Sequence, residues 1–204
     1  ALVVVDQQLA GARPPVAPAI PDQKYLAVLP FKDLSGQPQG QLFGDGLAET
    51  ISARLANISG IQVMPPSAAT QSALADKDFR RVAQNLGANL LLRGAVQRAG
   101  DRVRITYSLL NAQTDVQIAG DTVDGSMADI FAMEDQLAES VVTSLRLQAA
   151  AVPATATPAG LRDAAAQDRY LQAVGYLNRY ENEASVDGAI SLLEQLTGTG
   201  GESA

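Results

Sequence analysis

The amino-acid sequence predicts an α/β fold (an α+β sandwich), in which helices pack on a mixed β-sheet, followed by a helical hairpin. Short apolar runs alternate with segments of helical periodicity in the first half of the chain. Runs typical of an antiparallel meander then follow one another, with turn residues and no helix between them. Two further helical stretches occupy the last quarter of the sequence.

The first half of the chain is predicted to form two successive β-α steps. Short apolar strands are expected at Tyr25 to Phe31 and at Ile61 to Met64. Between them, Leu42 to Ile58 has the apolar spacing of a helix, and Gly60 follows as a stop signal. A second helix is expected between a capping aspartate, Asp78, and a glycine at the C′ position, Gly87.

The meander comes next, with strands predicted at 89–98, 102–110 and 116–123. Arg102 to Leu110 alternates apolar with polar residues, so one face should be buried and the other should face water. Ser126 and Asp129 have the spacing of a capping box in front of another helix. The predicted order is therefore β-α-β-α-β-β-β-α, which defines a mixed sheet with helices packed on it.

Composition shifts divide the chain into four parts. Residues 1–23 are predicted to be a Pro-rich linker, and the apolar run Leu2 to Val5 is either the end of a membrane span or a stray strand or disordered end. Residues 24–148 form the α/β domain, and residues 149–160 (AAAVPATATPAG) form a second linker. Residues 161–204 form the helical hairpin.

Composition also narrows the range of functions that this chain can have. The formal net charge is −7, from 22 acidic and 15 basic residues, and this argues against a nucleic-acid partner for this segment. The chain has no Cys and no His, so thiolate chemistry is excluded and the commonest general base and metal ligand are missing. No catalytic, cofactor-binding or metal-binding residue is predicted, no cofactor is expected, and an enzyme is the least favoured class.

The stretch KYLAVLPFKDLSGQPQGQLFGDGL (residues 24–47) resembles the start of a nucleotide site, because a Gly-rich segment joins a strand to a helix. A P-loop requires Lys and Ser or Thr after its last glycine, whereas Leu47 follows Gly46. A dinucleotide fingerprint requires a third glycine where Glu49 stands. We therefore interpret this stretch as structural, with Asp45 near a helix N-terminus.

Other charged residues give no specific signal for chemistry. Glu134 and Asp135 are adjacent, so they point in different directions around a helix and are not expected to form a working carboxylate pair alone. Arg102 and Arg104 could contact an acidic partner, although a solvated sheet face is favoured. The same solvated interpretation applies to Arg80 and Arg81.

Four segments, in order, resemble the TolB amino-terminal-type α/β domain: LAVLPFKDLSG, LFGDGLAETISARLANISGIQVMPPSA, VAQNLGANLLLRGAVQRAGDRVRITYSLLNAQT and DIFAMEDQLAESV. They cover residues 24–148 without large gaps. The hairpin resembles the opening unit of a tetratricopeptide array, with Ala189, Leu193 and Leu196 where the second repeat helix has small and apolar residues. The usual Trp and the closing Pro are absent, and one repeat cannot bury its own face, so more repeats are expected to follow.

This resemblance implies a sensor or interaction module of a bacterial signalling protein, and it carries over no catalytic motif. Such modules commonly follow a Ser/Thr kinase, nucleotidyl cyclase or winged-helix DNA-binding domain and one membrane span. The implied location is the extracytoplasmic (periplasmic) side of the inner membrane, with the cytoplasm as the alternative. Contact with the membrane would occur only through a span preceding Ala1.

The hairpin is expected to offer a groove to a protein or peptide partner. The candidate contacts are Tyr170, Tyr176, Arg179 and Tyr180, which crowd onto one helix of a chain with few aromatic residues. Packing of these tyrosines against the α/β domain or the next repeat is the alternative. Two other functions stay open: a small-molecule receptor with its ligand at the junction of the α/β domain and the hairpin, and a homodimerisation or assembly domain.

Overall fold

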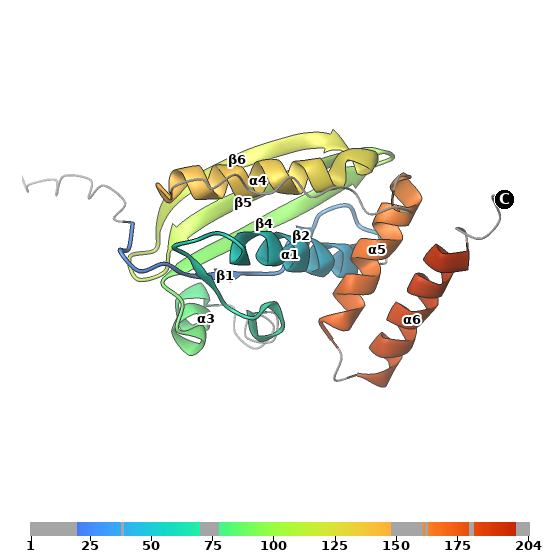
Figure 1. The fold of residues 1–204 in the computed structure, drawn as a ribbon, viewed down its shortest axis with the longest axis horizontal. Helices are drawn as coiled ribbons and strands as arrows, with labels where there is room; N and C mark the ends of the chain where they lie inside the picture. The colour runs from blue at the N-terminus through green and yellow to red at the C-terminus, as the bar shows by residue number, and fades with distance from the viewer. Residues whose placement is uncertain are drawn as a thin grey trace, which may run out of the picture.

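The computed structural model describes residues 20–37, 39–69, 78–147, 161, 163–179 and 182–198. The architecture is a mixed α/β fold, as predicted, with a six-stranded sheet and helices beside it (Figure 1). In chain order the elements are β1 (Tyr25–Val28), β2 (Lys32–Asp33), α1 (Gly40–Ala56), β3 (Gln62–Val63), α3 (Phe79–Leu86), β4 (Leu90–Ala99), β5 (Arg102–Asn111), β6 (Val116–Ser126), the 3₁₀ helix η1 (Met127–Asp129), α4 (Ile130–Ser144), α5 (Ala164–Leu177) and α6 (Glu183–Gly198).

The strand order in the sheet is β3-β1-β4-β5-β6, and β2 also pairs with β4. The early strands are parallel: β1 pairs with β3 and β4, and β2 pairs with β4 in the same sense. The three long strands β4, β5 and β6 form an antiparallel meander. Gly100 makes the β4–β5 turn at φ 61°, a conformation that favours glycine, so the tight turn predicted there is confirmed.

The strand predicted from Tyr25 to Phe31 is shorter than expected, and a second short strand follows the predicted range. β1 ends at Val28, and pairing with β4 resumes in β2, where Lys32 is opposite Ala95. Pro30 stands in the break, where it has no N–H to offer a neighbouring strand. Phe31 instead donates its N–H to the Gly44 carbonyl of α1, at 3.3 Å. The break therefore ties the sheet to the first helix.

Some helix boundaries follow the local signals and one does not. Asp78 accepts a hydrogen bond from the Arg80 N–H at 3.0 Å, and Gly87 adopts φ 65°, so both predicted ends of α3 are confirmed. The capping box predicted at Ser126 and Asp129 is wrong. Ser126 Oγ donates to the Asp129 carboxylate at 2.6 Å, so neither side chain caps the backbone, and η1 precedes α4.

The main hydrophobic core lies between the sheet and helices α1, α4 and α5. Its fully buried members include Phe43, Leu47, Leu92, Ile105 and Leu137. Strand β5 points Val103, Ile105, Tyr107 and Leu109 into this core. Arg102, Arg104, Thr106 and Ser108 point away from it, as the alternation predicts.

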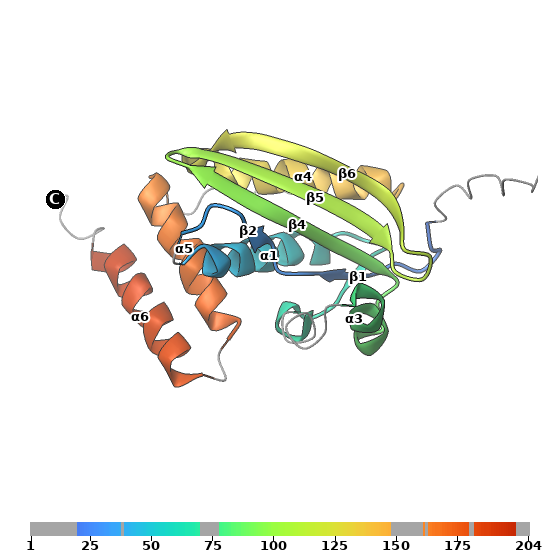
Figure 2. The same ribbon diagram turned by 180° about the vertical axis from the view of Figure 1, so that it is seen from behind.

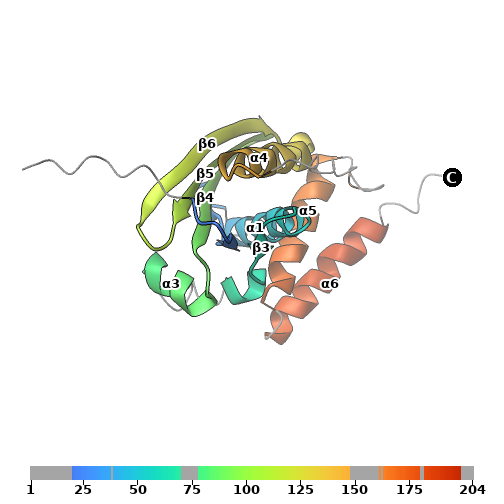
Figure 3. The same cartoon turned by 60° about the vertical axis from the view of Figure 1, so that its left-hand side comes forward.

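A smaller core occupies the opposite face of β1 and β4, beneath α3, and includes Leu29, Val82 and Leu91. Figure 2 shows the rest of that face, formed by β4, β5 and β6, without a helix over it. We call this uncovered surface the open face, and the surface beneath α1 and α4 the covered face. Figure 3 shows α1 and α4 beside the long strands, with α5 and then α6 beyond α1.

Helix α5 takes part in the same core as the sheet. Ala166 and Leu171 of α5 belong to the main cluster, as does Leu161 ahead of this helix, although all three were assigned to a separate hairpin. The predicted division into residues 24–148 and 161–204 stays a prediction. The linker at 149–160, most of the one at 1–23 and the Leu2 to Val5 run lie outside the described residues.

Candidate functional site

Helices α1 and α5 cross in direct backbone contact. A Cβ on Gly46 would lie 1.9 Å from the Leu171 carbonyl oxygen, and a Cβ on Gly175 would lie 2.0 Å from that of Leu42. Real side chains do not approach a backbone oxygen so closely, so each helix needs a glycine where it meets the other. The hairpin is therefore packed directly against the α/β domain.

The same contacts explain the Gly-rich stretch. Helix α1 already begins at Gly40, so Gly44, Asp45 and Gly46 lie inside the helix and not in a loop. A Cβ on Gly44 would meet the Phe31 carbonyl oxygen at 2.0 Å, and Gly46 faces α5. The glycines serve close packing on two sides, in keeping with the structural interpretation. Asp45 lies beyond the first turn of α1, further from the N-terminus than expected.

Asp45 joins α1 to the end of α5. Its side chain is 1% exposed, and its Oδ2 accepts hydrogen bonds from Arg179 Nη2 at 2.6 Å and Nε at 3.0 Å. Gln41 Nε2 donates to Oδ1 at 2.8 Å. Burial raises the pKa of Asp45, while Gln41 and Arg179 act in the opposite direction. A carboxylate this deeply buried requires both partners, so it fixes the place of Arg179.

A second ion pair fixes α5 to β4. Arg98 Nη1 donates to Asp168 Oδ1 at 2.7 Å, and Gln172 Nε2 donates to Oδ2 of the same carboxylate at 2.9 Å. The Arg98 guanidinium also stacks over the Phe43 ring, 4.4 Å from its centroid. The two ion pairs hold α5 at Asp168 and just beyond its C-terminal end.

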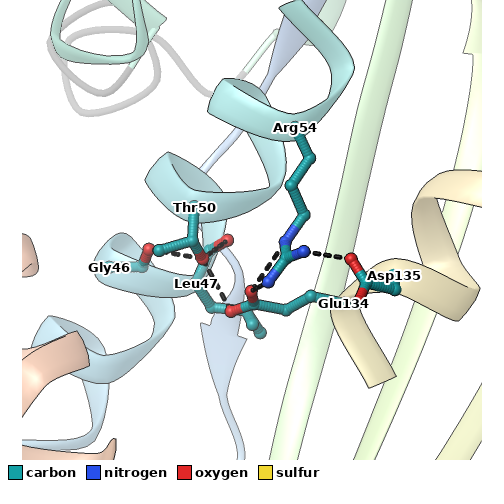
Figure 4. A network of polar contacts seen from close by, with 6 residues as sticks. All are labelled: Gly46, Leu47, Thr50, Arg54, Glu134 and Asp135. Atoms are coloured by element: carbon teal, nitrogen blue, oxygen red, sulfur yellow. Dashed lines mark hydrogen bonds and ion pairs between the residues drawn. The ribbon is translucent and has the colours of Figure 1, made fainter. Parts of the chain in front are cut away.

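A third polar network joins α1 to α4 (Figure 4). Arg54 Nε and Nη2 donate to Glu134 Oε2 at 3.0 and 2.7 Å, and Arg54 Nη1 donates to Asp135. Thr50 Oγ1 donates to Glu134 Oε1 at 2.7 Å. Sequence analysis missed this network, because it weighed the two adjacent carboxylates alone and not with a guanidinium that spans both.

Glu134 is the most perturbed acid of this network. Its side chain is 0% exposed, and burial raises its pKa to about 7, against the opposing effects of Arg54 and Thr50. The neighbouring charge of Asp135 raises this pKa further, since two carboxylates share one guanidinium. The network joins two helices, because Arg54 of α1 bonds to both carboxylates of α4.

The predicted partner contacts that the structure describes are packed against the α/β domain or against α6. The Tyr170 ring is 6.0 Å from the Phe131 ring of α4, at an interplanar angle of 65°. The Tyr176 ring lies against Gly188 of α6, where a Cβ would be 3.0 Å from its Cζ. Arg179 is bound to Asp45, and Tyr180 lies outside the described residues. Their role in partner binding stays a prediction.

The junction between the hairpin and the α/β domain contains a hollow of about 660 Å³. Six of its ten described lining residues carry an amide or charged side chain, and the others are small or apolar. The lining consists of Gln37, Gln39, Arg98, Gly100, Asp101, Met127, Ala164, Ala165, Asp168 and Gln172.

The outer surface of the hairpin is apolar in part. Leu177 at the end of α5 is 46% exposed, and Ile190 and Leu193 on α6 are 48% and 37% exposed. The charged residues of α6 are all acidic. Ala189, one of the three repeat-like positions, is fully buried, and Leu196 packs partly against the main core.

Two features are absent from residues 20–37, 39–69, 78–147, 161, 163–179 and 182–198. No group of three or more Cys, Asp or Glu side chains there is arranged to hold a metal ion. No helix within those ranges has both the length and the apolar character that a membrane crossing requires.

These features define an α/β domain with a mixed sheet and a helical hairpin held to it by a glycine crossing and buried ion pairs. The TolB amino-terminal domain family matches residues 16–118, and the chain belongs to this family. The resemblance inferred from the sequence is confirmed for this part of the chain.

A relative of known sequence is the Rhizobium meliloti protein named "Putative adenylate cyclase 3", which is 33% identical over 138 residues. The match covers 68% of this chain and 23% of that protein, so the chain spans less than a quarter of the relative's length.

Solved structures give partial likenesses at low identity. The LpoB C-terminal domain from Salmonella enterica has a TM-score of 0.43 and 15% identity, over 52% of this chain and 84% of that one. TolB from Acinetobacter baumannii has a TM-score of 0.44 and 12% identity, over 63% and 30%. The PelC dodecamer from Paraburkholderia phytofirmans has a TM-score of 0.42 and 16% identity, over 65% and 95%.

Proposed function

We propose that this chain is a non-enzymatic sensor or protein-interaction module of a bacterial signalling protein. The observation that carries the proposal is the contrast between the two sides of the hairpin. Its inner side is fixed to the α/β domain, whereas its outer side exposes large apolar residues. A surface of this kind, held in place by a rigid base, is suited to binding another polypeptide.

The inner side supplies the rigidity. Backbone contact at Gly46 and Gly175 leaves α5 no room to shift towards α1. The ion pairs of Asp45 with Arg179 and of Arg98 with Asp168 hold it at two further places. A rigid base lowers the entropy cost of binding, because the surface is already in its bound form.

The outer side supplies the contact area. Ile190 and Leu193 expose their side chains on α6, and Leu177 does so at the end of α5. We propose that a protein or peptide partner covers this surface, and that Tyr170, Tyr176, Arg179 and Tyr180 support it from the same hairpin. We further propose that α5 and α6 form the first tetratricopeptide-like unit, for which the full burial of Ala189 is favourable.

Our proposal also covers the longer protein to which this chain would belong. We assign this chain to the extracytoplasmic part of a membrane-tethered kinase, cyclase or transcription regulator. The name of the Rhizobium meliloti relative favours a cyclase among these outputs, since this chain matches only 23% of it and leaves ample length for a catalytic domain elsewhere. This chain would then regulate or localise the output domain without taking part in its chemistry.

The test is site-specific photo-crosslinking from Leu193 in the longer protein that contains this chain, with Gln97 on the open face as the control position. We expect Leu193 to crosslink to a second polypeptide or to repeats outside this sequence, and Gln97 to give a weaker reaction. Equal crosslinking from both positions would contradict the proposal. Turnover of a substrate by the purified chain would contradict its non-enzymatic part.

A second candidate function is a small-molecule receptor, which the hollow of about 660 Å³ at the junction favours. Gln172→Leu would add an apolar side chain to its lining and remove one hydrogen bond to Asp168. A metabolite that raises the melting temperature of the native chain and not that of the variant would support this function. Loss of crosslinking at Leu193 on its addition would connect the two functions.

A homodimer is a further alternative, since β6 lies at the edge of the sheet and its outer side has no strand partner among the described residues. Light scattering after size exclusion, over a series of protein concentrations, distinguishes the states. A dimer at all concentrations would support signalling by paired copies, and a monomer would leave the hairpin as the working surface.

A further inference from the structure

A separate hollow of about 480 Å³ lies where the strand breaks between β1 and β2. Its lining comes from the break itself, from α1, from α3 and from the neighbouring strands β4 and β5. The lining residues that matter here are Leu29, Pro30, Lys32, Phe79, Arg93 and Ala95. The hairpin contributes none of its described residues to this lining, so the hollow is distinct from the surface proposed above.

One wall of this hollow is apolar. Leu29, Pro30 and Ala95 contribute aliphatic surface, and Phe79 at the start of α3 leaves 37% of its surface exposed. Pro30 interrupts the pairing with β4 between Val28 and Lys32, and this interruption leaves the space open. An apolar wall beside an opening in the sheet is suited to the body of a small organic ligand.

Strand register places two cations beside this wall. Lys32 is opposite Ala95 in the pairing of β2 with β4, and Arg93 is two residues from Ala95, on the same face of the strand. The Arg93 guanidinium lies 4.8 Å from the centroid of the Phe79 ring. The register thus brings an ammonium, a guanidinium and an aromatic ring to one short stretch of the open face.

These two cations have no carboxylate partner within the part of the chain that the structure describes. Two other arginines on this side of the molecule are paired: Arg104 with Asp124 at 2.6 Å, and Arg80 with Asp115 at 3.8 Å. A guanidinium stacked on an aromatic ring keeps its N–H groups available in the plane, where a carboxylate can accept them as a pair.

The side chain of Asp45 also reaches this hollow, and its negative charge is already compensated by a guanidinium. Asp45 contributes to the lining, but its two oxygens are taken by Gln41 at 2.8 Å and by Arg179 at 2.6 Å. It therefore leaves the charges of Lys32 and Arg93 uncompensated. Thr106 and Ser108, opposite Ala95 and Arg93 in β5, add hydroxyl groups that can orient a polar ligand atom.

We propose that this hollow is a binding site for a small amphiphilic anion, an organic carboxylate with an aromatic or aliphatic body. The body packs on Phe79, Pro30 and Ala95, and the carboxylate accepts hydrogen bonds from Arg93 and Lys32. The site is independent of the partner surface on α6, so the chain can take part in ligand binding and in protein contact at the same time.

The test uses 2-naphthoate and its uncharged isostere 2-naphthamide as probes of the whole 204-residue chain. Binding is measured by calorimetry and by the amide chemical shifts of Gly94, Ala95 and Thr106. We expect 2-naphthoate to bind about tenfold more tightly than the amide, because only the carboxylate pairs with the two cations. Arg93→Gln and Lys32→Gln should each remove most of this preference, and Lys32→Arg should keep it.

The matched control is Arg104→Gln, which removes a cation from the same face but one that is already paired with Asp124. We expect it to leave the affinity for 2-naphthoate unchanged. Phe79→Ser should weaken the binding of both probes, since it removes part of the apolar wall on which the ring system of each probe packs. The proposal is overturned if neither probe saturates, if both bind equally, or if Arg93→Gln behaves like Arg104→Gln.

Discussion

Charged side chains are buried on one face of the sheet and exposed on the other. On the covered face, Arg54, Glu134 and Asp45 are almost without solvent, and each is held by two or more partners from other turns or other helices. On the open face, Arg104 and Asp124 form a bidentate pair that is more than half exposed. This pair raises the pKa of Arg104 and lowers that of Asp124, mainly through the hydrogen bonds between them.

The difference shows what each kind of pair does. A buried charge cannot be left alone, because its desolvation cost is recovered only when its partner is in place. The covered-face pairs therefore fix where α1, α4 and α5 lie. An exposed ion pair differs little in free energy from two separately hydrated charges, so it can open at little cost. The charged residues of the open face are therefore available to bind other molecules.

The largest expected effect comes from Arg54→Met, which leaves Glu134 buried without its cation. Breaking one side of a buried ion pair costs about 3–5 kcal/mol of unfolding free energy. Urea denaturation followed by circular dichroism measures this loss. Arg104→Met is the matched control on the open face and should give no measurable change. Equal losses for the two variants would remove the distinction between the faces.

The next effect comes from Gly46→Ala at the crossing of α1 and α5. Helix propensity alone would stabilise α1 by about 1 kcal/mol. The new methyl group meets the Leu171 carbonyl oxygen, and overpacking of this kind costs about 1–3 kcal/mol. We expect a net loss of stability with faster hydrogen exchange in α5.

Ala53→Gly is the control for propensity, since Ala53 is exposed on the same helix. It should cost about 1 kcal/mol and leave exchange in α5 unchanged. A gain of stability in Gly46→Ala would show that the helices do not meet at this glycine.

The buried carboxyl group of Glu134 should also make the stability of the protein depend on pH. Because the folded-state pKa of Glu134 is raised from 4.5 to about 7, the folded protein holds this proton more tightly than the unfolded chain. The resulting stabilisation is complete below pH 4.5 and is lost as the pH rises to about 7. Glu134→Gln should remove this contribution. The difference in unfolding free energy between the native chain and the variant should therefore change across this range, whereas parallel curves would contradict the raised pKa.

The smallest expected loss of stability comes from replacing an aspartate in a partly buried ion pair, compared with one in an exposed pair. Asp168→Asn weakens the pair with the mostly buried Arg98 and should cost roughly 1 kcal/mol. Asp124→Asn on the open face should cause no measurable loss, and any effect it has should vanish at high salt. A larger loss for Asp124→Asn would reverse the assignment of the two faces.

Local sequence signals predicted much of the fold. The cap at Asp78, the glycine stop at Gly87 and the alternation along β5 depend on residues a few positions apart, and each is found where it was predicted. The end of the first strand has an equally local cause in Pro30, and β1 ends two residues before this proline, at Val28. The capping box at Ser126 failed because two side chains with matching spacing hydrogen-bonded to each other instead.

The candidate site could not be predicted in the same way. Arg54 and Glu134 are 80 positions apart, and Asp45 and Arg179 are 134 apart. Nothing in the neighbourhood of either residue specifies its partner. The cations Lys32 and Arg93 meet only because β2 pairs with β4 in one register, and sequence analysis identified neither as a candidate.

The family was recognised from the order of similar segments along the chain. Composition and short-range periodicity were enough to predict the fold class, the lack of thiol and imidazole side chains and the polar side of β5. Only the tertiary structure decided that the Gly-rich stretch is a helix crossing and that Glu134 and Asp135 share one guanidinium. The physical reason is that burial and pairing depend on which surfaces meet. The meeting of α1 with α4 and α5 is settled by packing over the whole chain, not by the residues next to each site.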